Sequence, residues 1–418
     1  MRAVMIYMAL KVTADCATTS VWPLLLRDTL HGNIVLATTT AATMSSACGL
    51  AEVLINPVVG KLSDRFGRKA FFFLGPLANC ITSLLQIRYR RSIGICYLQR
   101  ICSQTLSTVS GSTIGTATLA DIVSGDRLTG ALGQVGSWAG LGVIIGPLIS
   151  GGLTILVGVE NQIVVGYCVR AAVSGATVIF LALRLDETLP VEKRRPFALS
   201  GVNPFGFLKL FRGSGTLRRL VMAHGFSCMC EGKMTSDTCM AWLMGPVALQ
   251  PSGVTAYLTG WGVACYASGA HLVHFFLDTI GPRRFTDLAM TTNALAHLLL
   301  GLVARPWVVA GYVALLTPGI NNLAAAALKS QATKHAVAQG FGKGEFAAAL
   351  ASLRALAFVV APTLWGRVYA GCANAGWSPG LAISAAGCLG AVLPGLLHRS
   401  ISAQAWEPSE DDVVKQLF

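Results

Sequence analysis

The sequence is poor in charge. Only 12% of its 418 residues are Asp, Glu, Lys or Arg, whereas 53% are hydrophobic; soluble chains average about 25% charged residues. So few charges cannot cover a surface that faces water, but they suit a surface that faces lipid. Because one crossing takes roughly 20 apolar residues, the length allows about 12 spans with short loops. We therefore expect an integral, multi-pass membrane protein.

The sequence also lacks the patterns of several kinds of catalytic and metal-binding protein. It has no G-x-x-x-x-G-K-[ST] phosphate loop, which argues against a self-powered ATPase. The 12 cysteines are scattered through apolar runs and are interpreted as small apolar side chains. Cys228 and Cys230 do not have a zinc spacing, and His271 and His274 have no further matching ligands. We expect no enzyme activity, no cofactor and no metal.

The apolar runs predict twelve spans. Lys11 and Asp15 interrupt the first run, which is therefore interpreted as the first helix rather than a signal peptide. The expected spans are residues 3–26, 34–59, 70–87, 93–118, 128–156, 162–184, 219–245, 253–277, 286–304, 306–328, 345–370 and 377–398.

One long hydrophilic stretch divides the chain. Residues 185–218 would form a cytoplasmic loop between two six-helix bundles at 1–184 and 219–400, with a cytoplasmic tail at 401–418. With both termini in the cytoplasm, 21 Lys and Arg residues fall in inner loops and 5 in outer loops, as the positive-inside rule requires. The net charge of +13 is thus assigned to the membrane surface and not to nucleic acid. A monomer is expected, and the sequence leaves the membrane of residence open.

Two internal echoes support a repeat. Asp64–Lys69 after the second span resembles Asp278–Arg284 after the eighth, at an offset of 214 residues. Lys11–Asp15 resembles Lys233–Asp237 at an offset of 222, a match short enough to be coincidence. Parallel repeats related by an axis along the membrane normal are a transporter architecture.

The short loop after the second span reads G-K-L-S-D-R-F-G-R-K from Gly60 to Lys69. Its glycines permit tight turns, and its arginines seek carboxylates. The loop resembles the signature of the major facilitator superfamily, G-x-L-[AS]-D-R-x-G-R-[RK]. In that family the loop Asp and Arg form an inner gate with an acid at the end of the fourth helix, which Asp121 matches. The gate residues implied by the resemblance are Gly60, Asp64, Arg65, Gly67, Arg68 and Asp121.

The fifth span carries a second pattern of small residues. Gly142 and Gly146 stack on one face, and Pro147 loosens the helix that contains them. With Gly133, these residues resemble the superfamily's antiporter motif, G-x8-G-x3-G-P-x2-G-G, in which Ser150 replaces one glycine. The resemblance implies proton-coupled efflux; a merely flexible helix is the alternative.

Further matches point to the branch of tetracycline-resistance and hippocampus-abundant-transcript proteins. Arg100 lies deep in the fourth span, where a lone charge is expensive and usually functional. The family has an Arg there that is linked to proton coupling, although the Gly that follows it is absent. The segment at 185–190 resembles the common P-E-T-L ending of the sixth span. The segments at 203–206 and 340–369, the latter including Arg354, resemble the same branch.

Acidic residues inside the spans are the candidate proton carriers: Asp15, Glu52, Glu231 and Asp237. Glu231 is preferred because the branch tends to have an acid there. Asp15 and Asp237 could instead form structural pairs with Lys11 and Lys233, four residues before them. The branch usually has an acid at the position of Lys11, so its proton mechanism cannot be carried over directly.

Asn321 and Asn322 could bind substrate, and interhelical hydrogen bonding is an equal alternative. The sequence thus predicts an all-α major facilitator fold of 12 transmembrane helices in two pseudo-symmetric bundles. Its expected function is alternating-access transport of a small organic solute as a proton-coupled antiporter. A facilitator or symporter on the same fold, and a non-transporting receptor or assembly factor, are the alternatives. Substrate identity is not readable from the fold.

Overall fold

The computed structural model describes residues 1–122, 126–194, 205–267, 273–302, 328–329, 331–333, 335–336, 338–341 and 343–402. Within these ranges the chain forms helices and turns, without strands. The helices before the central loop are α1 (Arg2–Cys16), α2 (Trp22–Thr29), α3 (Ile34–Phe66), α4 (Lys69–Phe72), α5 (Leu74–Arg88), α6 (Ile93–Thr108), η1 (Val109–Ile114), α7 (Gly115–Ile122), α8 (Asp126–Val157), η2 (Val159–Asn161) and α9 (Gln162–Arg184). The later ones are η3 (Val191–Lys193), η4 (Gly206–Arg212), α10 (Gly215–Cys228), α11 (Gly232–Met244), α12 (Pro251–Ala267), α13 (Val273–Leu302), α16 (Lys343–Asn374), α17 (Leu381–Gly387), η6 (Cys388–Val392) and α18 (Leu393–Arg399).

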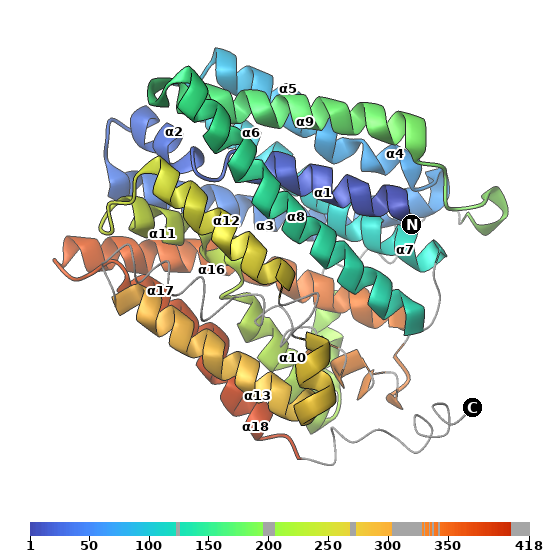
Figure 1. Ribbon diagram of the computed structural model, residues 1–418. Helices are drawn as coiled ribbons and strands as arrows, with labels where there is room; N and C mark the ends of the chain where they lie inside the picture. The colour runs from blue at the N-terminus through green and yellow to red at the C-terminus, as the bar shows by residue number, and fades with distance from the viewer. Residues whose placement is uncertain are drawn as a thin grey trace.

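The helices form two bundles. Figure 1 shows α5, α6 and α9 toward the top of the molecule and α10, α13 and α18 toward the bottom, with α3 and α16 side by side between them. We call the end that carries Gly60–Lys69 the inner end, after the expectation from charge, and the opposite end the outer end.

Six described helical segments are long and apolar enough to cross a membrane. They are Ile34–Phe66, Lys69–Arg88, Gln134–Val157, Val159–Arg184, Ala349–Asn374 and Leu381–Arg399. Each matches an expected span to within several residues. The expected span at 306–328 lies outside the described residues except for Leu328.

The expected first and seventh spans are each broken in two. The first consists of α1 and α2, joined by a turn over residues 17–21, and the seventh of α10 and α11, joined at residues 229–231. The fourth and twelfth contain the π-helical segments η1 and η6. Such wide turns interrupt the regular hydrogen bonding and frequently occur at functional sites.

The most extensive contacts between the bundles are those of α3 with α16 and of α8 with α12. Their contacts depend on small residues, as is usual where backbones approach closely in lipid. A Cβ on Gly49 would lie 2.6 Å from backbone atoms of Phe358 and Val359, and a Cβ on Gly262 would lie 2.9 Å from Ile144. Ser46 of α3 and Thr363 of α16 also share a hydrogen bond of 2.6 Å.

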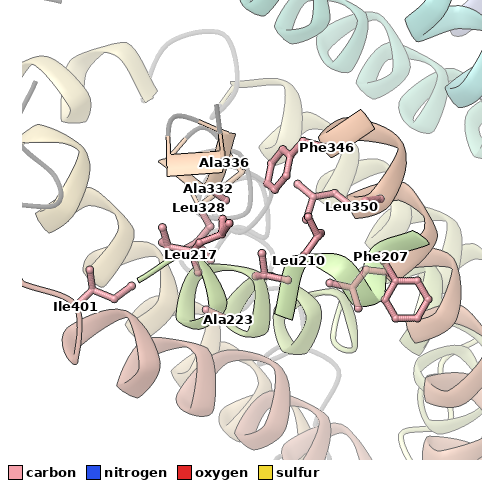
Figure 2. Packing of buried hydrophobic residues seen from close by; sticks show 14 of the residues in the cluster. Phe207, Leu210, Leu217, Ala223, Leu328, Ala332, Ala336, Phe346, Leu350 and Ile401 are labelled. Atoms are coloured by element: carbon pink, nitrogen blue, oxygen red, sulfur yellow. The ribbon is translucent and has the colours of Figure 1, made fainter. Parts of the chain in front are cut away.

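The central segment is more structured than its hydrophilic composition indicates. Residues 206–212 form η4, and Phe207 and Leu210, three residues apart, are buried on one face of it. Figure 2 shows these side chains near Leu217 of α10 and Phe346 and Leu350 of α16, in one apolar cluster. This part of the expected central loop therefore packs against the second bundle, because its two apolar side chains share a helical face.

The longer internal echo has a counterpart in the backbone. Gly67 (φ 100°, ψ 166°) and Gly281 (φ 76°, ψ 165°) adopt nearly the same conformation, 214 residues apart. Essentially only glycine adopts this region of backbone space. The two loops therefore turn in the same way.

Candidate functional site

A charged cluster lies at the inner end of the first bundle. Arg68 donates from Nε to Asp121 Oδ2 at 3.1 Å and pairs through Nη2 with Asp64 Oδ1 at 2.6 Å. It also donates to the Ser63 hydroxyl, which in turn donates to the carbonyl of Gly60 at 2.7 Å. The structure thus brings Arg68 together with both acids expected for the inner gate. Arg65 lies apart from this cluster, with its guanidinium 5.1 Å from the ring of Phe66.

Glu187 belongs to the same cluster and was not expected there. Its carboxylate accepts backbone N–H groups of Arg68 (2.8 Å) and Lys69 (3.1 Å) as well as those of Thr188 and Leu189. Burial acts to raise the pKa of Glu187, but the four N–H donors outweigh it and leave the pKa below its ordinary value. A Cβ on Gly67 would collide with this carboxylate. The segment that follows the sixth span therefore binds the loop that follows the second span.

The glycine pattern of α8 contacts α1 directly. A Cβ on Gly142 would lie 2.6 Å from the Ala9 carbonyl oxygen, and one on Gly146 would lie 2.5 Å from that of Thr13. Pro147 lies inside the helix one residue later, and Gly133 precedes both glycines in α8. These distances show that the helical face formed by Gly142 and Gly146 lies directly against α1.

Asp15 joins four helices of the first bundle. Lys11 of α1 pairs with its Oδ2 at 3.0 Å, as expected, and Arg170 of α9 approaches its Oδ1 at 3.3 Å. Asn79 of α5 and Ser107 of α6 donate to the same carboxylate at 2.9 and 2.8 Å. Sequence spacing predicted the lysine but gave no sign of the other three partners.

Arg100 and Asp237 form an ion pair between the bundles. Nη2 of Arg100 lies 2.8 Å from Oδ1 and 2.9 Å from Oδ2 of Asp237. Ser45 of α3 accepts from the same nitrogen at 2.9 Å and donates to Asp237 at 2.6 Å. The Arg100 guanidinium also faces the ring of Trp22, 5.0 Å from its centroid. Two residues singled out separately by sequence are thus direct partners.

Glu231 lies at the break between α10 and α11 and pairs with Arg354 of α16. Nε and Nη2 of Arg354 lie 2.8 and 2.6 Å from Glu231 Oε2. Glu52 of α3 is buried within electrostatic reach of Arg354, so a carboxylate from each bundle acts on the same cation.

Two cavities adjoin these pairs between the bundles. The first, counted with the open space at its mouth, has a volume of about 1040 Å³ and is lined largely by polar residues of the first bundle, including Asp15, Arg100 and Arg170, together with Asp237. The second, counted in the same way, has a volume of about 1180 Å³. It is lined mainly by the second bundle and includes Glu231. Both are lined in part by Cys16, Thr19, Ser236 and Met240.

The shorter echo does not correspond to equivalent positions. Asp15 precedes the break between α1 and α2, whereas Asp237 follows the break between α10 and α11. Their partners also differ, one lying within a bundle and the other across the two. The side chain of Lys233 and the whole of Asn321 and Asn322 lie outside the described residues, so their expected roles stay predictions.

Comparisons with known proteins identify the family of the chain. The model of the Major Facilitator Superfamily matches residues 4–362. The chain is 24% identical over 392 residues to the class C tetracycline resistance protein of Escherichia coli, covering 91% of this chain and 93% of the relative. It is 23% identical to the mouse Hippocampus abundant transcript 1 protein over 77% of this chain, and spans 64% of that longer relative. Multidrug resistance protein 2 of Bacillus subtilis is 25% identical over 62% of this chain and 63% of its own length.

Solved structures show the same fold. The crystal structure of the human organic anion transporter MFSD10 (TETRAN) matches with a TM-score of 0.69 at 19% identity, covering 95% of this chain and 98% of that one. A POT family transporter in complex with 5-aminolevulinic acid matches with a TM-score of 0.73 at 11% identity, covering 97% and 96%. Members of the Major Facilitator Superfamily are membrane transporters and not enzymes. With a family model that covers most of its length and a fold shared with solved transporters, the chain belongs to the Major Facilitator Superfamily.

Proposed function

We propose that the protein is a secondary active transporter that exchanges a small organic solute for protons by alternating access. The observation that carries the proposal is Glu231, whose carboxylate lines the cavity of the second bundle at a helix break and pairs with Arg354 of a neighbouring helix. Ionisable groups inside a membrane protein mark ion and proton pathways. A carboxylate that can exchange a cationic partner for a proton, beside a space large enough for an organic molecule, supplies both parts of an exchanger.

Two further features support exchange over simple facilitation. The glycines of α8 lie against α1 as the antiporter motif of the family implies. Relatives named for resistance to tetracycline and to multiple drugs share the fold and much of the length. Asp15 is less suited to carry the proton, because four donors from four helices already hold it.

The proposal is tested by transport in proteoliposomes that contain the purified full-length chain. A panel of metabolites and drugs is screened for uptake with and without an imposed pH gradient, and hits are followed by counterflow. We expect the gradient to drive accumulation in the parent protein. Glu231→Gln should lose this accumulation but keep counterflow, because exchange of solute for solute requires no proton step.

Other outcomes identify the alternatives. Counterflow that ignores the gradient indicates a facilitator, and accumulation with the opposite gradient sign indicates a symporter. Solutes that never move indicate a receptor or assembly factor. Proton antiport is wrong if the carboxylates at Asp15, Glu52, Glu231 and Asp237 can all be neutralised without loss of pH-dependent transport.

The same preparation tests the remaining expectations. The inner position of both termini is checked by protease access to tags in sealed vesicles, and the monomeric state by light scattering in detergent.

A further inference from the structure

The pair between Arg100 and Asp237 has a geometry that leaves the arginine partly unused. Both carboxylate oxygens bind one nitrogen, Nη2. Nε has no hydrogen-bond partner among the described residues, and Nη1 makes none with them either. The strong form of this pair is a fork in which two nitrogens each bind one oxygen. Nε is buried, so another carboxylate would have to bind Nη1 and Nη2, and with both nitrogens it could form a better pair than Asp237 does.

The guanidinium is held in place without help from Asp237. The ring of Trp22 lies 5.0 Å from it, a separation at which a cation is attracted to an aromatic face. Ser45 accepts a hydrogen bond from it at 2.9 Å. Because Trp22 and Ser45 both belong to the first bundle, Arg100 keeps its position in that bundle when Asp237 leaves.

The charges around the polar cavity favour an anion. Three cations line it, Lys11, Arg100 and Arg170, but only two carboxylates, Asp15 and Asp237. Asp15 is paired with both Lys11 and Arg170. Arg100 therefore depends for its counter-charge on Asp237, which comes from the other bundle.

The adjoining cavity suits an apolar body. Its lining includes Tyr257, Leu258 and Trp261 of α12 and Met240 of α11. Since both cavities are lined by Cys16, Thr19, Ser236 and Met240, a single molecule can occupy the two together. The pair of cavities is thus polar and cationic at one end and apolar at the other.

We propose that the substrate is an organic anion with an apolar, aromatic-sized body, and that its carboxylate replaces Asp237 on Arg100. The proposal rests on the proposed transport function and names its substrate class. In the empty protein the Arg100–Asp237 pair holds the bundles together beside the cavities. A bound carboxylate takes Arg100 and releases Asp237, so the bundles lose this bond when cargo is present. Because an unpaired Arg inside the membrane is costly, Arg100 stays paired with Asp237 in the empty protein.

Binding to the purified full-length chain tests the proposal. A matched panel of aromatic carboxylates, their carboxamides and their primary amines is screened by thermal shift, and affinities are then measured by titration. We expect carboxylates to bind in preference to the other two classes. Asp237→Asn removes the competing carboxylate and should tighten carboxylate binding about tenfold without changing carboxamide binding. Arg100→Gln should remove the preference for carboxylates.

Controls separate this effect from general damage. Arg27→Gln and Asp28→Asn make the same charge changes in an exposed pair near the outer end, and should leave the class preference unchanged. Arg100→Lys keeps the cation if Arg100→Gln proves unstable. In the double variant Arg100→Gln/Asp237→Asn the gain from Asp237→Asn should vanish. The proposal is overturned if no carboxylate binds, if amines are preferred, or if Asp237→Asn weakens carboxylates.

This test is independent of proton coupling, because no gradient is applied. A carboxylate preference with transport that ignores pH would overturn proton antiport and leave the substrate class standing. Gradient-driven transport of amines would support proton antiport and overturn the proposed substrate class.

Discussion

Gly67 is required twice at the inner loop, once for its backbone and once for the space beside it. Its φ and ψ angles lie in a region that costs other residues about 1–3 kcal/mol, and a Cβ would strike the Glu187 carboxylate. Gly281 has the same backbone angles but no atom within 4 Å of such a Cβ. We predict that Gly67→Ala lowers the thermal midpoint of the purified protein more than Gly281→Ala does. Equal losses would show that Glu187 exerts no constraint at Gly67.

Glu187 should make the stability of this loop depend on pH. Its pKa lies below the ordinary 4.5 because backbone N–H groups bind the ionised form. The stabilisation is therefore complete above the unfolded value and is lost as pH falls through the lower native value. We predict that Glu187→Gln costs about 0.5–1 kcal/mol at pH 7, a modest figure because the group is partly exposed. Thermal midpoints from pH 7 to pH 3.5 should converge for parent and variant, and a constant gap would contradict the prediction.

Residue patterns predicted some of these contacts and missed others for a physical reason. Asp64 and Arg68 are one helical turn apart, and the acid at the end of the fourth helix came from a family motif. Glu187 binds backbone N–H groups 118 and 119 residues away, and such donors leave no trace in side-chain types. Side-chain types therefore predict the side-chain partners of Arg68 but not the hydrogen bond from its backbone N–H to Glu187.

At the scale of elements, the contact between α8 and α1 leaves no room for a side chain on either of two glycines. A Cβ at Gly142 or Gly146 would meet backbone atoms of α1 at 2.5–2.6 Å, and backbone cannot move aside as a flexible side chain can. We predict that Gly142→Ala and Gly146→Ala each destabilise the protein by about 1–3 kcal/mol and slow transport. Gly152→Ala in the same helix meets nothing within 4 Å, so it should be neutral or slightly stabilising. Thermal midpoints and counterflow rates check this, and a similar loss at Gly152 would count against a specific contact.

The elements themselves were predictable to different degrees. The long apolar run at 162–184 predicted the bounds of α9 closely, because burial in lipid demands little beyond apolarity and length. The breaks in the first and seventh spans were missed, since the runs stay apolar across them. The burial of η4 was missed because its charged neighbours, Lys209 and Arg212, dominate the composition of the segment.

At the scale of the whole molecule, the family and fold followed from sequence, but the connection between the bundles did not. Arg100 and Asp237 are 137 residues apart on different bundles, and each was considered alone or with a neighbour four residues away. Only the packing of α3, α6 and α11 shows that they share one ion pair with Ser45. Where a contact depends on how two bundles meet, local spacing carries no information about it.

The way the bundles meet leads to a last prediction, on the transport cycle. The alternating access that we propose would require α3 and α16 to separate and close again. Gly49 lets them close, since a Cβ there would lie 2.6 Å from the backbone of α16. Gly49→Ala should therefore disfavour the state seen here without unfolding either bundle. We expect it to slow counterflow while the protein stays monodisperse.

A labelling experiment checks the change in state. A cysteine at Thr38, which is 3% exposed and lies toward the outer end, should become more reactive to an impermeant maleimide in the Gly49→Ala background than in the parent background. Gly371→Ala, in α16 with nothing within 4 Å, is the matched control and should change neither rate nor labelling. Unchanged labelling in Gly49→Ala would mean that the bundles part elsewhere than along α3 and α16.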